Sequence, residues 1–237
     1  MLKTQGSHPL SVRSASNAAR TLGRIAAVSS MLLIAACAGQ QARLSPENRD
    51  SLSSESQIYA VHHKSLTGFT YESTGYVLAG VFFTPLVAIA QAGEGVGLVN
   101  ELKLEDPVLR VEDRLVKTLQ ERFKVSNVSV AANPPKNDQV ASIVQAYPTG
   151  VVLDVRTMKW GVDNARAIYK ARARLIRSSS STIVWQATCK FTADKDKPAP
   201  KMDDLKANSG ILLKAKILDA ADGCADQLVN WVTDQDR

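Results

Sequence analysis

The stretch that decides the fold, IYKARARLIRSSSSTIVWQATCKF, runs from Ile168 to Phe191. Small or apolar side chains alternate with polar ones on both sides of a serine turn at Ser178–Ser181, which indicates two β-strands joined as a hairpin. The apolar face carries Tyr169, Ala171, Ala173, Leu175, Ile183, Trp185, Ala187, Cys189 and Phe191. We therefore predict an antiparallel hairpin with one face against a core and the other face in water.

The segments on both sides of this hairpin supply further strands and three helices. β-forming or alternating runs predict strands at Ile58–His63, at Asn127–Ala132 and from Val151 onwards. Apolar residues at three- and four-residue steps predict helices at Glu105–Phe123 and Asp138–Tyr147. After a polar excursion, a last helix has a stripe of Leu213, Ile217, Ala221, Cys224, Leu228 and Trp231. The pattern predicts an α/β (α+β) fold, a two-layer sandwich in which helices cover a mainly antiparallel or mixed sheet.

Two cysteines fall on the predicted buried surfaces. Cys189 lies on the apolar face of the hairpin, and Cys224 lies on the stripe of the last helix. Because both side chains point at one core, we predict a disulfide between them, as is usual in an oxidising compartment. Two independent buried thiols are the alternative.

The segment Tyr76–Ala92, YVLAGVFFTPLVAIAQA, is an apolar insert without any charged residue. It is short for a membrane span, and Pro85 would kink a helix in its middle. Three interpretations remain open: a buried core element, a hydrophobic hairpin that dips into a lipid surface, and an apolar patch for a partner. Since short apolar runs are most often core, the first interpretation is favoured.

A second informative stretch lies near the N-terminus, where Ile25–Cys37 reads IAAVSSMLLIAAC. Arg20 and Arg24 precede a short apolar run, which is typical of an export signal rather than of a membrane span. The final tetrad, IAAC at Ile34–Cys37, resembles the lipobox of bacterial lipoproteins.

This resemblance implies a processing route and a location. Residues 1–36 would be a signal peptide, and Cys37 would carry the lipid and become the mature N-terminus. Two or more acyl chains, such as palmitate, hold a protein stably on a membrane. Ala38 and Gly39 follow the cysteine in place of the aspartate that retains such proteins at the inner membrane. The resemblance therefore implies a lipid anchor at the periplasmic face of the outer membrane.

Processing would also change the charge of the chain. The four basic residues before Cys37 are Lys3, Arg13, Arg20 and Arg24, and their removal lowers the formal net charge from +6 to +2. A strongly basic field is therefore not a property of the mature chain, and nucleic acid is not an expected partner. Residues 37–57 are polar and predict a flexible tether. Residues 58–237 would form a single periplasmic domain.

Motifs that carry catalysis are not found in the sequence. Gly93–Gly97 reads GEGVG and lacks both the Walker lysine and the spacing of a dinucleotide loop, and no G-x-S-x-G, H-E-x-x-H or C-x-x-C is present. His62 and His63 are adjacent on a predicted strand, so they face opposite sides and cannot readily share a metal ion. No catalytic residue, metal site or cofactor is predicted.

The best-defined polar feature is the stripe of Lys170, Arg172 and Arg174 on one strand face. Such a stripe is usually a solvated sheet face, and the alternative is a dock for anionic headgroups or an acidic partner. Asp154 and Arg156 on the preceding strand are expected to form a surface pair of little energetic weight.

Element order from Pro107 to Val232 resembles that of accessory lipoproteins of envelope transport and assembly systems. This resemblance implies a non-catalytic binding or assembly protein of the cell envelope with a protein partner, and it does not name the partner or the oligomeric state. The alternatives are an envelope enzyme, of the carboxylate-based hydrolase kind, and a carrier of lipids or small molecules.

Overall fold

The computed structural model describes residues 44–55, 57–66, 68–72, 95–131 and 134–233. These residues belong to one compact unit that extends from Gln40 to Arg237. The predicted lipidation site Cys37, residues 1–36 and the apolar insert at 76–92 lie outside the described residues. Among the helices of the described part, none combines the length and the apolar character of a membrane span.

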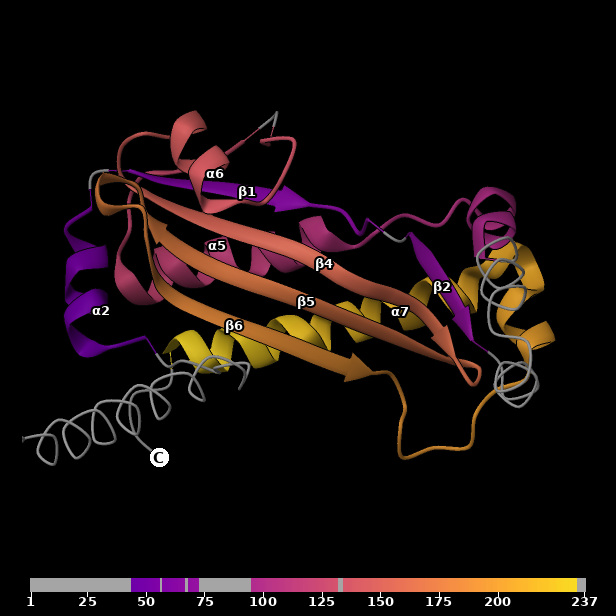
Figure 1. The fold of residues 1–237 in the computed structure, drawn as a ribbon. Coiled ribbons are helices and arrows are strands. Elements are labelled where there is room, and N and C mark those ends of the chain that lie inside the picture. The colour runs from indigo at the N-terminus through magenta and orange to yellow at the C-terminus, as the bar shows by residue number, and fades with distance from the viewer. Residues whose placement is uncertain (1–43, 56, 67, 73–94, 132–133, 234–237) are drawn as a thin grey trace, which may run out of the picture. The chain divides into compact units, whose positions relative to one another are not determined.

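A six-stranded mixed sheet forms the centre of the domain (Figure 1). Its strands are β1 (Ile58–His63), β2 (Phe69–Glu72), β3 (Val128–Val130), β4 (Val151–Asp163), β5 (Arg166–Arg177) and β6 (Thr182–Thr192). The order is β3-β1-β4-β5-β6, with β2 beside the far end of β4. β4, β5 and β6 are antiparallel, whereas β1, β2 and β3 make parallel pairs. The predicted hairpin and the predicted fold class are confirmed.

Helices cover the two faces of the sheet unequally. Those with defined bounds are α2 (Pro46–Ser53), α5 (Val108–Phe123), α6 (Val140–Ala146) and α7 (Met202–Thr233), and residues 95–102 are helical as well. Figure 1 shows α5 and α7 behind the strands, where their buried side chains join the main core. The short α6 lies on the opposite face and closes a small second core of Val61, Ile143, Val152 and Ile176. The fold therefore differs from the predicted two layers in that α6 covers part of the second face of the sheet.

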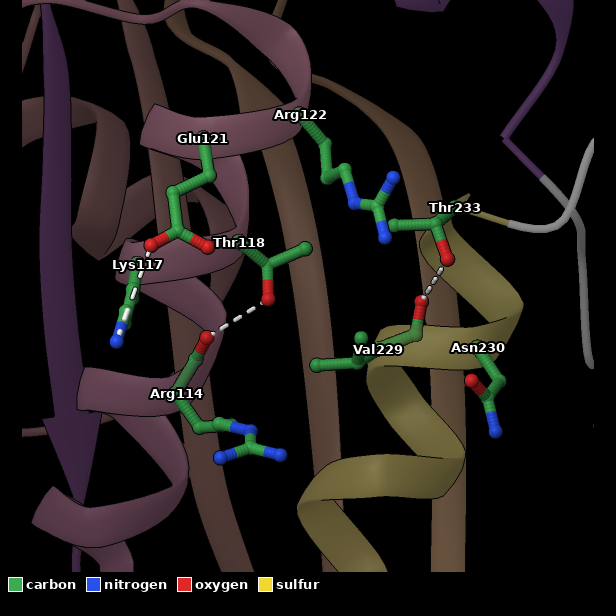
Figure 2. Close-up of a pocket in the computed structure, with 8 residues that line it drawn as sticks. All are labelled: Arg114, Lys117, Thr118, Glu121, Arg122, Val229, Asn230 and Thr233. Carbon is green, nitrogen blue, oxygen red and sulfur yellow. Dashed lines mark hydrogen bonds and ion pairs between the residues drawn. The ribbon is translucent and has the colours of Figure 1, made fainter.

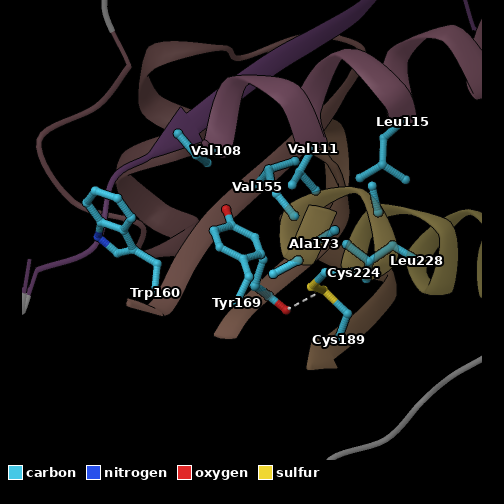
Figure 3. Close-up of a cluster of buried hydrophobic side chains, with 14 of the residues drawn as sticks. Val108, Val111, Leu115, Val155, Trp160, Tyr169, Ala173, Cys189, Cys224 and Leu228 are labelled. Atoms are coloured by element: carbon cyan, nitrogen blue, oxygen red, sulfur yellow. Dashed lines mark hydrogen bonds between the residues drawn. A yellow bond between two sulfur atoms is a disulfide. The ribbon is translucent and has the colours of Figure 1, made fainter. Parts of the chain in front are cut away.

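The main core contains the predicted cysteine pair (Figure 3). Cys189 of β6 and Cys224 of α7 form a disulfide, and their Cα atoms lie 5.2 Å apart. Tyr169 and Ala173 of β5 lie beside it in the same core. The covalent bond ties the last helix to the sheet that it covers.

A β-bulge in β4 keeps its apolar side chains on the core side. The register with β5 shifts between Thr157 and Lys159. Before the shift Val155 faces the main core, and after it Trp160 and Val162 face the same core. Without the additional residue, the second half of the strand would present its apolar side chains to the opposite face.

Polar side chains at the outer edge of the sheet pair with the backbone of β6. The amide group of Gln227, on α7, donates to the carbonyl of Lys190 and accepts from its N–H, both at 3.3 Å. The amide nitrogen of Asn48, on α2, donates to the carbonyl of Val184 at 3.2 Å.

Three expectations need correction. The predicted tether contains α2, which is capped by Ser45 and buries Leu52, so this part is packed on the domain. The expected polar excursion after β6 already includes the first turns of α7, which has a break at Ala207–Gly210. Ile183 is exposed, because a register shift between β5 and β6 turns it away from the main core.

Candidate functional site

The two histidines at the end of β1 point to opposite faces of the sheet, as predicted. His62 lies on the side of α5, where its Nδ1 is 3.0 Å from Oε2 of Glu112. His63 lies on the opposite side, where its Nε2 is 3.3 Å from Oδ1 of Asp154. Both carboxylates are fully buried, so each histidine has its own buried acidic neighbour.

The pair of His62 and Glu112 changes the acid–base behaviour of the histidine. The hydrogen bond that His62 donates to Glu112 raises the pKa of His62, burial acts in the opposite direction, and the charge of Glu112 adds to the rise. The net effect is a pKa above the ordinary value of 6.5. A larger fraction of His62 is therefore charged at neutral pH than in an exposed histidine.

Asp154 is the centre of a buried ion-pair network on the second face of the sheet. Its Oδ2 accepts from Nε of Arg174 at 2.8 Å and from Nη2 of Arg172 at 3.2 Å. The side chain of Arg174 is only 7% exposed. The expected surface pair between Asp154 and Arg156 is wrong, because α6 and the segment before it cover this part of the sheet.

Asp138 continues this network to the surface. It forms ion pairs with Arg156 and with Nη2 of Arg172, the latter at 2.6 Å. Burial disfavours the charged form of Asp138, but the hydrogen bonds from Arg156 and Arg172 outweigh it and hold its pKa well below the ordinary value. The carboxylate is thus fixed as an anion and is a poor proton acceptor at neutral pH.

A pocket of about 340 Å³ opens above this network, at the end of β1. Its lining comes from β1 and the residues that follow it, from the segment before α6, and from β4. The lining residues are His62, His63, Lys64, Leu66, Pro134, Lys136, Asn137, Asp138, Gln139 and Arg156. Three permanent cations and one carboxylate therefore face a single cavity.

Two of these cations form no close ion pair with a described residue, although Asp106 lies near enough to Lys64 for their charges to interact. Lys64 and Lys136 are exposed, and within the described part of the chain neither side chain forms an ion pair or a hydrogen bond. Arg156, by contrast, is held by Asp138. The pocket thus combines a fixed polar floor with two free positive charges at its rim.

Most of the basic stripe on β5 forms ion pairs within the protein. Arg172 and Arg174 are bound by Asp138 and Asp154, so they are not available as a dock for an external anion. Only Lys170 is exposed, and it lies opposite Lys190 of β6. The interpretation of Lys170, Arg172 and Arg174 as one anion-binding surface therefore fails for the two arginines.

A second pocket lies between the C-terminal ends of α5 and α7 (Figure 2). Its charged side chains are mostly paired, Arg114 with Asp226 at 2.9 Å and Lys117 with Glu121 at 3.8 Å. The hydroxyl of Thr118 donates to the backbone carbonyl of Arg114 in its own helix, at 2.9 Å. These contacts leave fewer groups free for a ligand than the pocket at the end of β1.

Sequence reasoning missed Asp138 and misplaced Asp154. The signal for Asp154 was present in the alternation, since this acidic residue and the three basic residues of the stripe fall on the same sheet face of neighbouring strands. Asp138 was seen only as the start of a helix, and nothing local indicates that its carboxylate reaches two arginines of the sheet.

Comparisons with known proteins identify no family. No protein-family pattern and no curated protein matches the sequence. Solved structures with some likeness include the PelC dodecamer from Paraburkholderia phytofirmans (10% identity, 76% of this chain and 88% of that chain, TM-score 0.38). A second is protein XCC0632 from Xanthomonas campestris (12% identity, 74% of this chain and 82% of that chain, TM-score 0.38). A third is lipoprotein GNA1162 from Neisseria meningitidis (12% identity, 70% of this chain and 99% of that chain, TM-score 0.20). Likeness at this level carries no argument about function.

Proposed function

We propose that this chain is a lipid-anchored protein of the bacterial cell envelope whose domain binds an anionic group of a ligand or partner without transforming it. The observation that carries the proposal is the pocket at the end of β1. Its rim lysines, Lys64 and Lys136, are unpaired within the described residues, while its carboxylate, Asp138, is bound by two arginines.

This arrangement supports binding more than chemistry. A general base needs a pKa near the working pH, and the pKa of Asp138 is shifted in the opposite direction. The buried Asp154 is likewise surrounded by guanidinium groups. An anion that enters the pocket would meet free positive charge at the rim and would not meet a carboxylate that is ready to accept a proton.

Anchoring is the second part of the proposal, and it rests on the lipobox-like sequence that ends at Cys37. Replacing the cysteine by alanine should leave an uncleaved precursor without acyl label in the inner membrane. Normal processing of Cys37→Ala, with the protein still in the outer membrane, would contradict the anchor.

Binding in the envelope can be tested by site-specific photo-crosslinking. Leu66 lines the pocket, and its side chain is 86% exposed, so a photoreactive amino acid at this position reports on an occupant. We expect a discrete adduct in the outer-membrane fraction that is lost when Lys64 and Lys136 are both changed to glutamate. The matched control is Lys190→Glu, an equal charge reversal on β6 outside the pocket.

The hydrolase alternative gives the opposite result at Asp138. If this residue were a catalytic acid or base, Asp138→Asn would abolish function in cells while the rim substitutions would change it little. If the pocket binds an anion, the rim substitutions should abolish function and Asp138→Asn should change it little, because removal of a negative charge makes the pocket more attractive to an anion. An adduct at Leu66 that is insensitive to the rim charges would also refute the proposal.

A further inference from the structure

We propose that the anion bound in this pocket is a phosphate monoester, either a free small molecule or the headgroup of a phospholipid. This inference rests on the proposed binding function and names the chemistry that the same site would recognise. It is carried by the charge of the lining and by the spatial spread of its donors.

The charge of the lining matches a dianion. Lys64, Lys136 and Arg156 contribute three positive charges and Asp138 contributes one negative charge, which leaves two positive charges in excess. A phosphate monoester carries a charge of about −1.5 to −2 at neutral pH, whereas a carboxylate carries only one negative charge. A monoester therefore neutralises the pocket more completely than a carboxylate.

The donors also come from several directions. Lys64 follows β1 and Lys136 belongs to the segment before α6, while Arg156 on β4 adds positive charge at the floor, where Asp138 holds it. A tetrahedral group with three terminal oxygens can accept from donors on separate segments, whereas a planar carboxylate suits a single guanidinium fork. At about 340 Å³, the cavity also has room for the alcohol part of an ester, since ligand pockets of roughly this size bind small molecules.

His63 belongs to the floor of the pocket rather than to its free donors. Its side chain is 9% exposed, and its Nε2 lies 3.3 Å from Oδ1 of the buried Asp154. An anion in the pocket would therefore rely on the lysines of the rim.

Binding can be measured by titration calorimetry on the full lipidated protein in a non-ionic detergent. The probes are inorganic phosphate, glycerol 3-phosphate and dihexanoyl phosphatidic acid, with acetate as the single-charge comparison. We expect the phosphate probes to bind more tightly than acetate, and their affinity to fall with rising salt. Each of Lys64→Gln and Lys136→Gln should weaken glycerol 3-phosphate on the order of tenfold, and Lys190→Gln should not.

The two sources of the phosphate give different results. Tighter binding of the short-chain phosphatidic acid than of glycerol 3-phosphate would assign the site to a phospholipid headgroup, and equal binding would assign it to a free ester. Circular dichroism of each variant shows whether the fold is retained. Because both lysines are exposed, their replacement leaves no buried group unpaired.

Failure of this inference can be told apart from failure of the proposed function. If no phosphate probe binds, or if all bind the double lysine variant as well as the wild type, the phosphate assignment is wrong. A charge-dependent adduct at Leu66 would then still support the binding function with another anion. If the adduct is also insensitive to the rim charges, both proposals fail.

Discussion

Asp154 lies directly opposite Arg174 in the β4–β5 register, and its buried carboxylate accepts from Nε of Arg174 at 2.8 Å. Arg172 adds a second contact to the same oxygen, at 3.2 Å. A fully buried carboxylate and a nearly buried guanidinium thus neutralise each other beneath the pocket, where neither can be hydrated. The floor of the candidate site is therefore also a structural element of the sheet.

Asp154→Asn should strongly destabilise the domain, because it leaves the charge of Arg174 buried without its counter-ion. Removal of one partner of a buried pair typically costs about 3 to 5 kcal/mol. The free energy of unfolding in urea, measured at neutral pH, tests this. The control is Asp222→Asn, which breaks the exposed pair with Arg110 and should change stability by less than about 1 kcal/mol. Equal effects of the two substitutions would contradict the assigned role of Asp154.

Loss of the disulfide between Cys189 and Cys224 should lower stability without changing the fold. The bond joins residues that are 35 apart in sequence. Closing a loop of that length in the unfolded chain is worth about 4 kcal/mol in the chain-entropy model. The double substitution to alanine should therefore melt at a clearly lower temperature. Thiol counting on unfolded, unreduced protein should find neither cysteine free, and two reactive thiols would show that the bond does not form.

His62 should titrate above the ordinary histidine pKa of 6.5, and Glu112→Gln should remove most of this shift, since the hydrogen bond to the Glu112 carboxylate is its largest cause. Because the folded-state pKa is raised, the stabilisation is fully present below the unfolded value and is lost as the pH rises through the folded value. The stability difference between wild type and Glu112→Gln should accordingly shrink on going from acidic to alkaline pH. NMR titration of the imidazole gives the pKa directly. A value in the variant equal to that of the wild type would exclude Glu112 as the cause.

Gly161→Ala should disrupt the pairing of β2 with β4. Gly161 has φ of 150°, and a Cβ at this position would collide with the backbone carbonyl oxygen of Thr70. We expect a loss of more than about 1 kcal/mol in the free energy of unfolding. The control is Gly97→Ala, in the helix at 95–102, where a Cβ meets nothing within 4 Å. That substitution should be neutral or stabilise by about 0.5 to 1 kcal/mol, and a similar loss in both variants would contradict the close approach of β2.

The elements that the sequence predicted are those with strong local periodicity. The alternation around Ser178–Ser181 and the three- and four-residue steps of Val108, Val111, Leu115 and Leu119 correspond to β5, β6 and α5 in the structure. The pairing of Cys189 with Cys224 followed because two periodic patterns point both side chains at the same core. In each case the pattern that predicts the structure lies within one helix or strand and marks its buried face.

The site could not be predicted in the same way, because it depends on register. The two-residue turn at Asn164–Ala165 fixes the pairing near the end of the β4–β5 hairpin. Counting back from that turn without a bulge would place Asp154 opposite Leu175. The bulge between Thr157 and Lys159 shifts the register by one residue and brings Asp154 to Arg174. A four-residue strand such as β2 is missed for a related reason, since its pairing with β4 is a non-local contact.

Residues 44–55 differ from the predicted tether because local helix signals outweigh their average composition. Residues 44–55 are mostly polar, and this favoured disorder. The same segment contains Ser45 as a side-chain cap and Pro46 in the first turn, both of which favour a helix start. A single buried leucine, Leu52, then packs the helix on the domain.

Two side-chain amide groups occupy backbone positions on the outer edge of β6. Gln227 occupies both backbone hydrogen-bonding groups of Lys190, and Asn48 occupies the carbonyl of Val184. These are the groups that another chain would need in order to add a strand to this edge. A second copy would first have to displace two side chains that are fixed to helices. Strand addition is thus opposed at these two positions of β6.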